Sequence, residues 1–161
     1  QTCALPIYPS TTLTAWKQPI VVTDPNTADV KFGGTYAVGA VTGGTPYPSR
    51  GLSLDVGNDV QYTPLLGGEY VDITNRVVTG ALQLDLTAAQ EVTFMGNGKS
   101  ATVQSLGITH GTVAGFKSLL FMPSVQLINP GKAELNGKRL ISYDLRVNPS
   151  AGNDELRLVL Y

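Results

Sequence analysis

The sequence contains few charged residues. Of its 161 residues, 14% are Asp, Glu, Lys or Arg, against a usual share of about a quarter. The 11 basic and 12 acidic side chains give a formal net charge of −1. A domain that holds nucleic acid by its phosphates needs a basic excess, so the composition argues against a nucleic-acid-binding protein. The composition is still compatible with a protein that nucleic acid passes without being bound.

Cysteine and histidine occur once each, as Cys3 and His110. One thiol cannot close a disulfide within the chain, and one thiol with one imidazole falls short of the ligand set of a zinc site. The sequence therefore predicts no disulfide framework and no metal centre. His110 lies in Ile108–Thr112, which we interpret as a turn between strands, so we expect a surface turn residue rather than a catalytic group.

Long hydrophobic runs are absent. The longest candidate, Ser118–Met122, stops at Pro123, whereas a membrane span needs about 20 apolar residues. Gln1–Ile7 has neither the basic start nor the apolar core of a signal peptide. We therefore expect no association with a membrane.

The first seven residues, Gln1–Ile7, are what a common sequencing-adapter oligonucleotide encodes when it is read through in frame. We interpret them as an assembly artefact, and a natural N-terminal arm is the alternative. On this interpretation Cys3 is not part of the authentic protein, whose chain is expected to continue upstream of Tyr8. Residues 8–28 have the composition of a linker or N-terminal arm, and residues 29–161 form the predicted β domain.

Turn-forming residues and alternating strands make up most of the remaining sequence. The 18 glycines and 10 prolines suit short strands joined by many turns. Four segments alternate apolar and polar residues with the period of half-buried strands. Their apolar sets are Leu52, Leu54 and Val56; Val78, Gly80, Leu82, Leu84 and Leu86; Ile141, Tyr143, Leu145 and Val147; and Leu156, Leu158 and Leu160. A further strand is expected at Tyr36–Val41 and a proline-rich turn at Pro46–Pro48. The sequence thus predicts an all-β fold of two packed sheets, like a sandwich or barrel.

One short helix interrupts the strands. Thr87 and the Gln three residues later have the spacing of a capping box, which satisfies two backbone N–H groups at a helix start. No Gly or Pro follows until Gly96, which can adopt the left-handed conformation that ends a helix. We predict a helix near Thr87–Met95, held to the sheets through Val92 and Met95.

No constellation of residues marks an active site. Gly98–Ser100 resembles the end of a phosphate-binding loop, but Thr93 stands where that motif needs a glycine, so we interpret the segment as a helix exit. The carboxylates are scattered, and exposed strand positions are favoured over a glycosidase pair. They are Asp55, Asp59, Glu69, Asp72, Asp85, Glu91, Glu134, Asp144, Asp154 and Glu155. We therefore predict that the protein is not an enzyme and has no catalytic, cofactor-binding or metal-binding residues.

Several segments, in this order along the chain, resemble the tail tube proteins of long-tailed bacteriophages. In the middle of the chain these are Gly51–Asn58 and Val71–Gly80, and in the C-terminal third they are Ile108–Gly115, Met122–Leu127 and Asn148–Leu158. The likeness covers about residues 8–161.

The resemblance implies a structural virion protein. Such proteins form rings that stack into the tail tube, around a tape-measure protein before infection and conducting DNA afterwards. The implied fold is a pair of packed β-sheets flanked by a helix, with one sheet joining its neighbours to line the lumen. The implied partners are further copies in threefold or sixfold rings, the tape-measure protein and other tail proteins, while DNA passes without specific binding. The implied location is the virion tail, assembled in the host cytoplasm, and no cofactor is implied.

Two other interpretations stay open. Another tail, baseplate or decoration protein of a phage would share this fold and composition. A β-sandwich carbohydrate-binding or adhesin module would carry aromatic residues clustered on one exposed face, a pattern that the predicted strands lack. The low charge favours the conduit, because every Lys or Arg that contacts phosphate adds affinity for nucleic acid.

Overall fold

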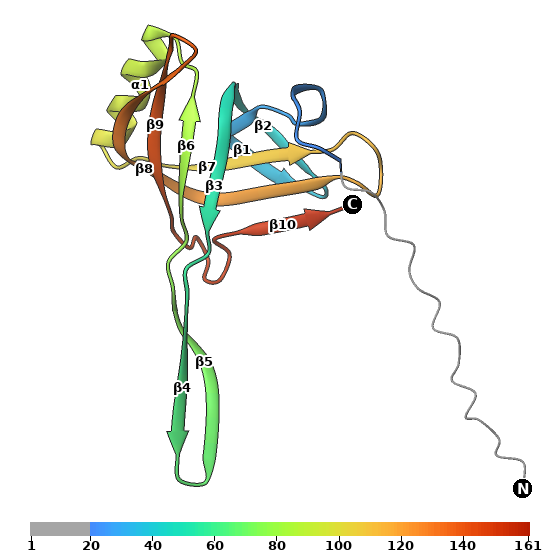
Figure 1. Cartoon of the computed structure of the whole chain (residues 1–161), viewed down its shortest axis with the longest axis vertical. Coiled ribbons are helices and arrows are strands. Elements are labelled where there is room, and N and C mark those ends of the chain that lie inside the picture. Colours follow the sequence, from blue (N-terminus) through green and yellow to red (C-terminus); the bar gives the residue numbers. More distant parts are fainter. Residues whose placement is uncertain (1–19) are drawn as a thin grey trace, which may run out of the picture.

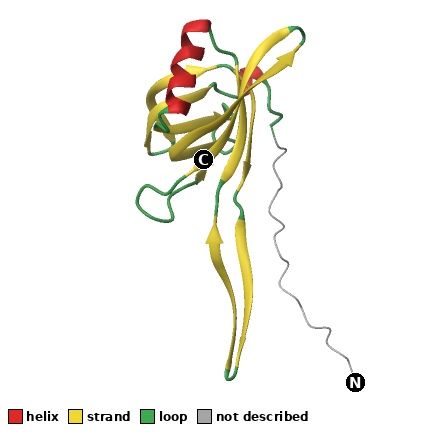
Figure 2. Cartoon of the chain, turned by 90° about the vertical axis from the view of Figure 1, so that its left-hand side faces the viewer, coloured by secondary structure: helices red, strands yellow, loops and turns green. Residues whose placement is uncertain are grey.

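The computed structural model describes residues 20–161 as a β-rich body with one helix and one long projecting hairpin (Figures 1 and 2). The elements are η1 (Asp24–Asn26), β1 (Val30–Ala37), β2 (Ala40–Tyr47), β3 (Ser49–Asp55), β4 (Asn58–Leu65), β5 (Gly68–Arg76), β6 (Thr79–Leu84), α1 (Ala88–Lys99), β7 (Val103–His110), β8 (Ser118–Leu135), β9 (Lys138–Val147) and β10 (Arg157–Leu160). Residues 1–7, interpreted as an artefact, and residues 8–19 of the predicted linker lie outside the described residues. No helix within residues 20–161 is long and apolar enough to cross a membrane.

The body is built on one eight-stranded antiparallel sheet that folds over on itself. Its order is β2-β1-β7-β8-β9-β6-β3, and β10 also pairs with β8. The long strand β8 belongs to both halves, because its first part pairs with β7 and β10 and its second part pairs with β9. The ladders shift register where β8 passes Pro123 and again at Pro130, two residues that have no N–H to donate. The two halves therefore face each other around a shared core, which confirms the prediction of an all-β fold with packed sheets (Figure 1).

The shared core confirms two of the predicted strand faces. The inward residues of β9 are buried as predicted: Ile141, Tyr143, Leu145 and Val147. On the neighbouring segment Val78, Leu82 and Leu84 are buried, and Leu86 packs against the same cluster. Leu52 and Leu54 of β3 also contact the core, but Val56 lies beyond the end of β3 and is exposed, so that prediction is wrong. At this position the chain is already leaving the body for the projecting hairpin.

Tyr143 places a polar atom inside this core. Its side chain is buried, and the hydroxyl has no hydrogen-bond partner among residues 20–161. Burial raises the pKa of this phenol above its ordinary value of 10.0, and the nearby carboxylate of Glu91 raises it further. The hydroxyl therefore remains protonated and unsatisfied, which costs free energy.

We predict that Tyr143→Phe leaves the fold intact and raises the free energy of unfolding by about 1 kcal/mol, because it removes a buried hydroxyl that nothing satisfies. Chemical denaturation of the two proteins measures the difference. A loss of stability on substitution would show instead that the hydroxyl is hydrogen-bonded in the folded protein.

The helix begins as predicted and ends later than predicted. The capping box is present, with Thr87 accepting from the backbone N–H of Gln90 and the Gln90 side chain accepting from that of Thr87. The helix continues past Gly96 to Lys99, because Gly96 keeps a helical conformation and the backbone N–H and hydroxyl of Ser100 both donate to its carbonyl. The predicted stop at Gly96 is therefore wrong.

The helix docks through a residue that the prediction missed. Phe94 is 3% exposed, and its ring lies edge-on to those of Phe32 and Tyr47, at centroid distances of 5.3 and 4.9 Å. Met95 packs against the core as predicted, but Val92 is 74% exposed, so its predicted packing role is wrong. The aromatic side chains of β1 and β2 turn a different side of the helix toward the sheet.

The first hairpin differs from the prediction. The segment Tyr36–Val41 is not one strand, because β1 ends at Ala37 and β2 begins at Ala40 after a tight turn with Gly39 at φ 71°. The predicted turn at Pro46–Pro48 is also wrong, since β2 runs to Tyr47 and only Pro48 separates it from β3. The edge position of β2 tolerates Pro46.

The C-terminal strand presents the face opposite to the predicted one. Of the predicted apolar set, Leu156, just before β10, packs against the main core as expected, but Leu158 and Leu160 are 63% and 74% exposed. Within β10 it is Val159 that packs inward, against a small second cluster of Val41, Leu119 and Phe121. Arg157 stacks on the Tyr36 ring, 4.4 Å from its centroid, which fixes the face that turns inward. Leu158 and Leu160 therefore remain in solvent.

Candidate functional site

The hairpin of β4 and β5 forms a long two-stranded arm that stands away from the body in both views (Figures 1 and 2). The two strands pair over nearly their whole length, and they form a sheet of their own. A two-stranded hairpin in water is marginally stable by itself and gains stability when one of its faces is covered. The arm is therefore the first place to look for an interaction surface.

The arm has one apolar face. Residues paired directly across a hairpin point to the same side, and Val60 pairs with Ile73 while Tyr62 pairs with Val71. These four side chains are between 57% and 68% exposed. At the tip Leu66 is fully exposed and Leu65 is about half exposed. An apolar area of this kind on a projecting element is typical of a protein–protein contact.

The opposite face of the arm is polar and acidic. Gln61 pairs with Asp72 and Thr63 with Tyr70, and Asp59 bonds to the Gln61 side chain, so these groups share the second face. From Asn58 to Asn75 the arm carries three carboxylates (Asp59, Glu69, Asp72) and no Lys or Arg, a net charge of −3. None of these carboxylates is in an ion pair with the described residues. Of the three, Asp59 and Asp72 lie on this second face, whereas Glu69 pairs with Pro64 on the apolar face. The arm thus offers a partner a mainly apolar side and a side with two carboxylates.

An ion pair fixes the base of the arm to the C-terminal loop. Arg76, the last residue of β5, donates to Glu155 at 2.5 Å and to Asn153 at 3.2 Å. Glu155 is 8% exposed, the one buried charged residue of the described chain. Because burial removes the screening of water, this pair is stronger than an ordinary surface salt bridge. It sets the direction in which the arm leaves the body.

We predict that Glu155→Gln lowers the free energy of unfolding by about 1–3 kcal/mol, because the partly exposed guanidinium of Arg76 loses the charge of its buried acceptor while the shape is kept. Limited proteolysis should cut the arm sooner in this variant, since its base is less firmly held. Glu134→Gln, the same change at an exposed carboxylate of β8 that is in no ion pair with the described residues, is the matched control. Equal stability of Glu155→Gln and the unchanged protein would contradict the clamp.

The loop that carries Glu155 is itself held by a carboxylate. Asp154 accepts hydrogen bonds from the backbone N–H groups of Ser150 and Ala151, at 2.8 and 3.1 Å. These bonds lower the pKa of Asp154 below its ordinary value of 3.8, and the positive charge of Arg157 lowers it further. Because the folded-state pKa is depressed, the stabilisation is present above about pH 4 and is lost as the pH falls further.

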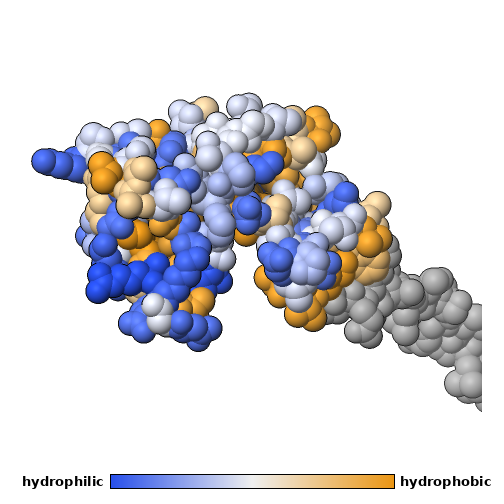
Figure 3. Space-filling view, turned by 90° about the horizontal axis from the view of Figure 1, so that it is seen from above, coloured by the Kyte–Doolittle hydropathy of each residue, from blue (hydrophilic) through white to orange (hydrophobic). Residues whose placement is uncertain are grey.

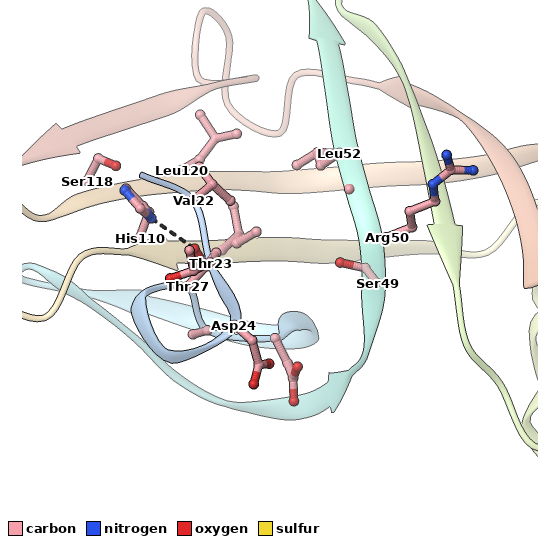
Figure 4. A pocket seen from close by; sticks show the side chains of 14 residues that line it. Val22, Thr23, Asp24, Thr27, Ser49, Arg50, Leu52, His110, Ser118 and Leu120 are labelled. Atoms are coloured by element: carbon pink, nitrogen blue, oxygen red, sulfur yellow. Dashed lines mark hydrogen bonds between the residues drawn. The ribbon is translucent and has the colours of Figure 1, made fainter. Parts of the chain in front are cut away.

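A cleft of about 510 Å³ opens between residues 22–29, the start of β3, the end of β7 and the start of β8 (Figure 4). Leu52, Ile108 and Leu120 give it an apolar floor, and its polar groups include Asp24 and Arg50. Within residues 20–161 no Phe, Tyr or Trp lines it, so the described lining offers no ring on which a sugar would stack.

His110 lies in this cleft, and its predicted place in a surface turn is wrong. It is the last residue of β7, half-buried, with Nδ1 2.9 Å from the Thr27 hydroxyl and Nε2 3.1 Å from the Ile20 carbonyl oxygen. Both ring nitrogens are thus engaged in holding residues 20–28 against the body. The backbone bonds from Ala28 to Thr109 and from Gly111 to Asn26 strengthen the same attachment.

The remaining candidates of the sequence do not converge. Within residues 20–161 no three His, Cys, Asp or Glu side chains come together as a metal site. Three of the scattered carboxylates form ion pairs: Asp85 with Lys138, Glu91 with Lys132 and Glu155 with Arg76. Gly98–Ser100 is the end of α1 and its cap.

The sequence did contain a signal for the arm that the strand prediction did not use. Val60 and Tyr62 alternate with polar residues before Leu65–Gly68, and Val71 and Ile73 alternate after it. Two alternating runs around a glycine-containing turn indicate a hairpin.

No protein-family model matches the chain, and no curated protein is significantly similar to it.

Proposed function

We propose that the chain is a structural subunit of a bacteriophage tail tube, whose copies assemble through their arms into stacked rings that conduct DNA. The ordered likeness of its segments to tail tube proteins motivates the proposal. The all-β body flanked by a single helix agrees with the fold that this likeness implies.

The observation that carries the proposal is the uncovered arm. Four exposed apolar side chains on one face of a two-stranded ribbon are left in water when the chain is alone. Burying this face against another chain would stabilise both the ribbon and the contact. In a structural subunit that assembles with its own copies, such an arm would be covered by a neighbouring copy. In an enzyme or small-ligand binder that stays monomeric, the same face would remain exposed to water.

The charges on the sheet support passage of DNA without retention. On the outer side of β3, β6 and β9 most side chains are short and uncharged, including Ser53, Gln83 and Ser142. Its charged groups balance, three of each sign: Arg50, Lys138 and Arg146 against Asp55, Asp85 and Asp144, with Lys138 and Asp85 in an ion pair. Seen from above, hydrophilic and hydrophobic areas alternate over the body (Figure 3). DNA binds tightly where Lys and Arg side chains contact its phosphates and release counterions. A channel wall without a basic excess makes few such contacts, so DNA can slide past it.

Electron microscopy of the concentrated full chain tests the proposal. We expect rings or short tubes with a continuous channel, and no retardation of double-stranded DNA by the protein at physiological salt. A dispersed monomer at high concentration, or tight binding of DNA, would contradict the proposed function. A baseplate or decoration protein, the alternative among virion parts, would form a closed plug or bind a capsid instead of stacking into a tube.

A further inference from the structure

Three strand edges of the body are unpaired in the described residues: those of β2, β3 and β10. An unpaired edge presents a row of backbone N–H and C=O groups that another strand can bind. Only β10 also carries large apolar side chains that are more than half exposed, Leu158 and Leu160. Among the three, β10 is therefore the edge best suited to receive a partner.

The two sides of β10 differ in chemistry. Leu158 pairs with Leu120 and Leu160 with Ser118, so the exposed leucines continue the apolar floor of the cleft. Arg157 and Val159 point to the other side, where Lys117 adjoins Tyr161. Arg157 and Lys117 lie over aromatic rings and form no ion pair with the described residues. One side of this edge is thus apolar and the other is cationic.

The arm also has two chemically different sides, and their chemistry is complementary to that of the two sides of β10. One side of the arm carries Val60, Tyr62, Val71 and Ile73, with Glu69 near the tip, and the other side carries Asp59 and Asp72 together with the half-exposed Tyr70. A strand added to a sheet keeps its two faces on the two sides of that sheet. An arm strand laid along β10 with its apolar side toward Leu158 and Leu160 therefore brings its acidic side to Lys117 and Arg157. Both faces match in a single placement.

We propose that the arm of one copy binds the free edge of β10 of a second copy as an added strand. This inference rests on the proposed self-assembly and names the two surfaces that make the contact. The arm extends away from the body of its own chain, so the contact joins two copies (Figures 1 and 2). It is head-to-tail, the type of contact from which rings and filaments are built.

Two carboxylates of the body limit how the arm can lie. Asp154 interacts electrostatically with Arg157, and Asp24 lines the cleft whose floor is apolar. Both carboxylates would repel an acidic segment of the arm. Glu69 pairs with Pro64 near the tip, on the apolar side of the arm. The tip is therefore expected to stay on the β10 side of the cleft, away from Asp24.

Two blocked variants of the full chain test the pairing. Val71→Asp with Ile73→Asp blocks the arm, and Leu158→Asp with Leu160→Asp blocks the edge. We expect each variant alone to associate about tenfold or more weakly than the unchanged chain, because a central apolar contact is lost. Mixed together, the two variants should form a heterodimer and nothing larger, since one good arm meets one good edge. Sedimentation velocity measures all three cases.

A matched control and a charge exchange complete the test. Val92→Asp changes an equally exposed residue on α1 and should leave association unchanged. Asp72→Lys should weaken association, and adding Lys117→Asp in the same chain should restore it. Normal assembly of the edge-blocked variant, with loss in the arm-blocked one, would overturn the pairing and leave the proposed function standing. A monomeric unchanged chain would overturn the proposed function itself.

Discussion

Replacing Phe94 by alanine is expected to lower the free energy of unfolding by about 3–5 kcal/mol, enough to unfold a marginal domain. The ring is almost completely buried between Phe32, Tyr47 and Tyr143, and it attaches the helix to the sheets. Its removal leaves a cavity that the aromatic neighbours cannot fill without leaving their rotamers. Thermal or chemical denaturation of the two proteins gives the difference.

Val92→Ala on the same helix is the control for this prediction. Its side chain is exposed, so the change should stay within about 0.5 kcal/mol of the unchanged protein. Similar losses at Phe94 and Val92 would mean that the helix docks through a different side from the one described.

Aspartate at both Val71 and Ile73 is expected to abolish assembly while the body stays folded. These residues lie on the uncovered face of the arm, so each carboxylate would have to be buried against the neighbouring copy without a partner. The arm packs mainly on itself, so the melting temperature of the body should hardly change. Light scattering against concentration, with circular dichroism melts of the same samples, separates the two effects.

Thr63→Asp is the matched control on the other face of the arm, where Thr63 pairs with Tyr70. It introduces one carboxylate into the same ribbon, against two in the Val71 and Ile73 variant, and leaves the apolar face intact. Equal loss of assembly in this variant would show that the arm fails through a weakened hairpin and not through a lost contact.

The parts of the fold that sequence reasoning predicted are those fixed by local chemistry. The period of two in β9 and the capping box at Thr87 are each set by neighbours within a few residues. The errors occur where distant residues decide. Gly96 stays helical because the Ser100 hydroxyl donates to its carbonyl oxygen. The helix packs through Phe94 and not through Val92, because the Phe94 ring contacts Phe32 of β1 and Tyr47 of β2.

The C-terminal strand and His110 show the same limit. The alternation at Leu156–Leu160 gives two sets of apolar residues, and only the cluster around Val41 and Arg157 on Tyr36 selects Val159 as the inward one. For His110 the surrounding sequence indicates a turn. In the structure it is the last residue of β7, and its ring nitrogens bond to Thr27 and Ile20, which are far away in the sequence. Contacts between residues so far apart in the chain cannot be predicted from local sequence patterns.

The arm follows from the sequence only as a hairpin and not as a projecting element. Alternation at Val60–Tyr62 and Val71–Ile73 indicates two strands with an apolar side. Ordinarily that side would be assigned to the core of the same chain. The structure leaves it uncovered, with its base clamped by Arg76 and Glu155, and this makes a second copy the natural partner.

Native mass spectrometry of the full chain over a range of concentrations tests the central claim most directly, because it counts the copies in each particle. Head-to-tail contact through the arm predicts growth from the monomer into closed rings of three or six copies, or into longer stacks of them. A species that remains monomeric at every concentration would contradict the account. So would a dimer that grows no further, because its two copies would then share one self-complementary patch instead of an arm and an edge.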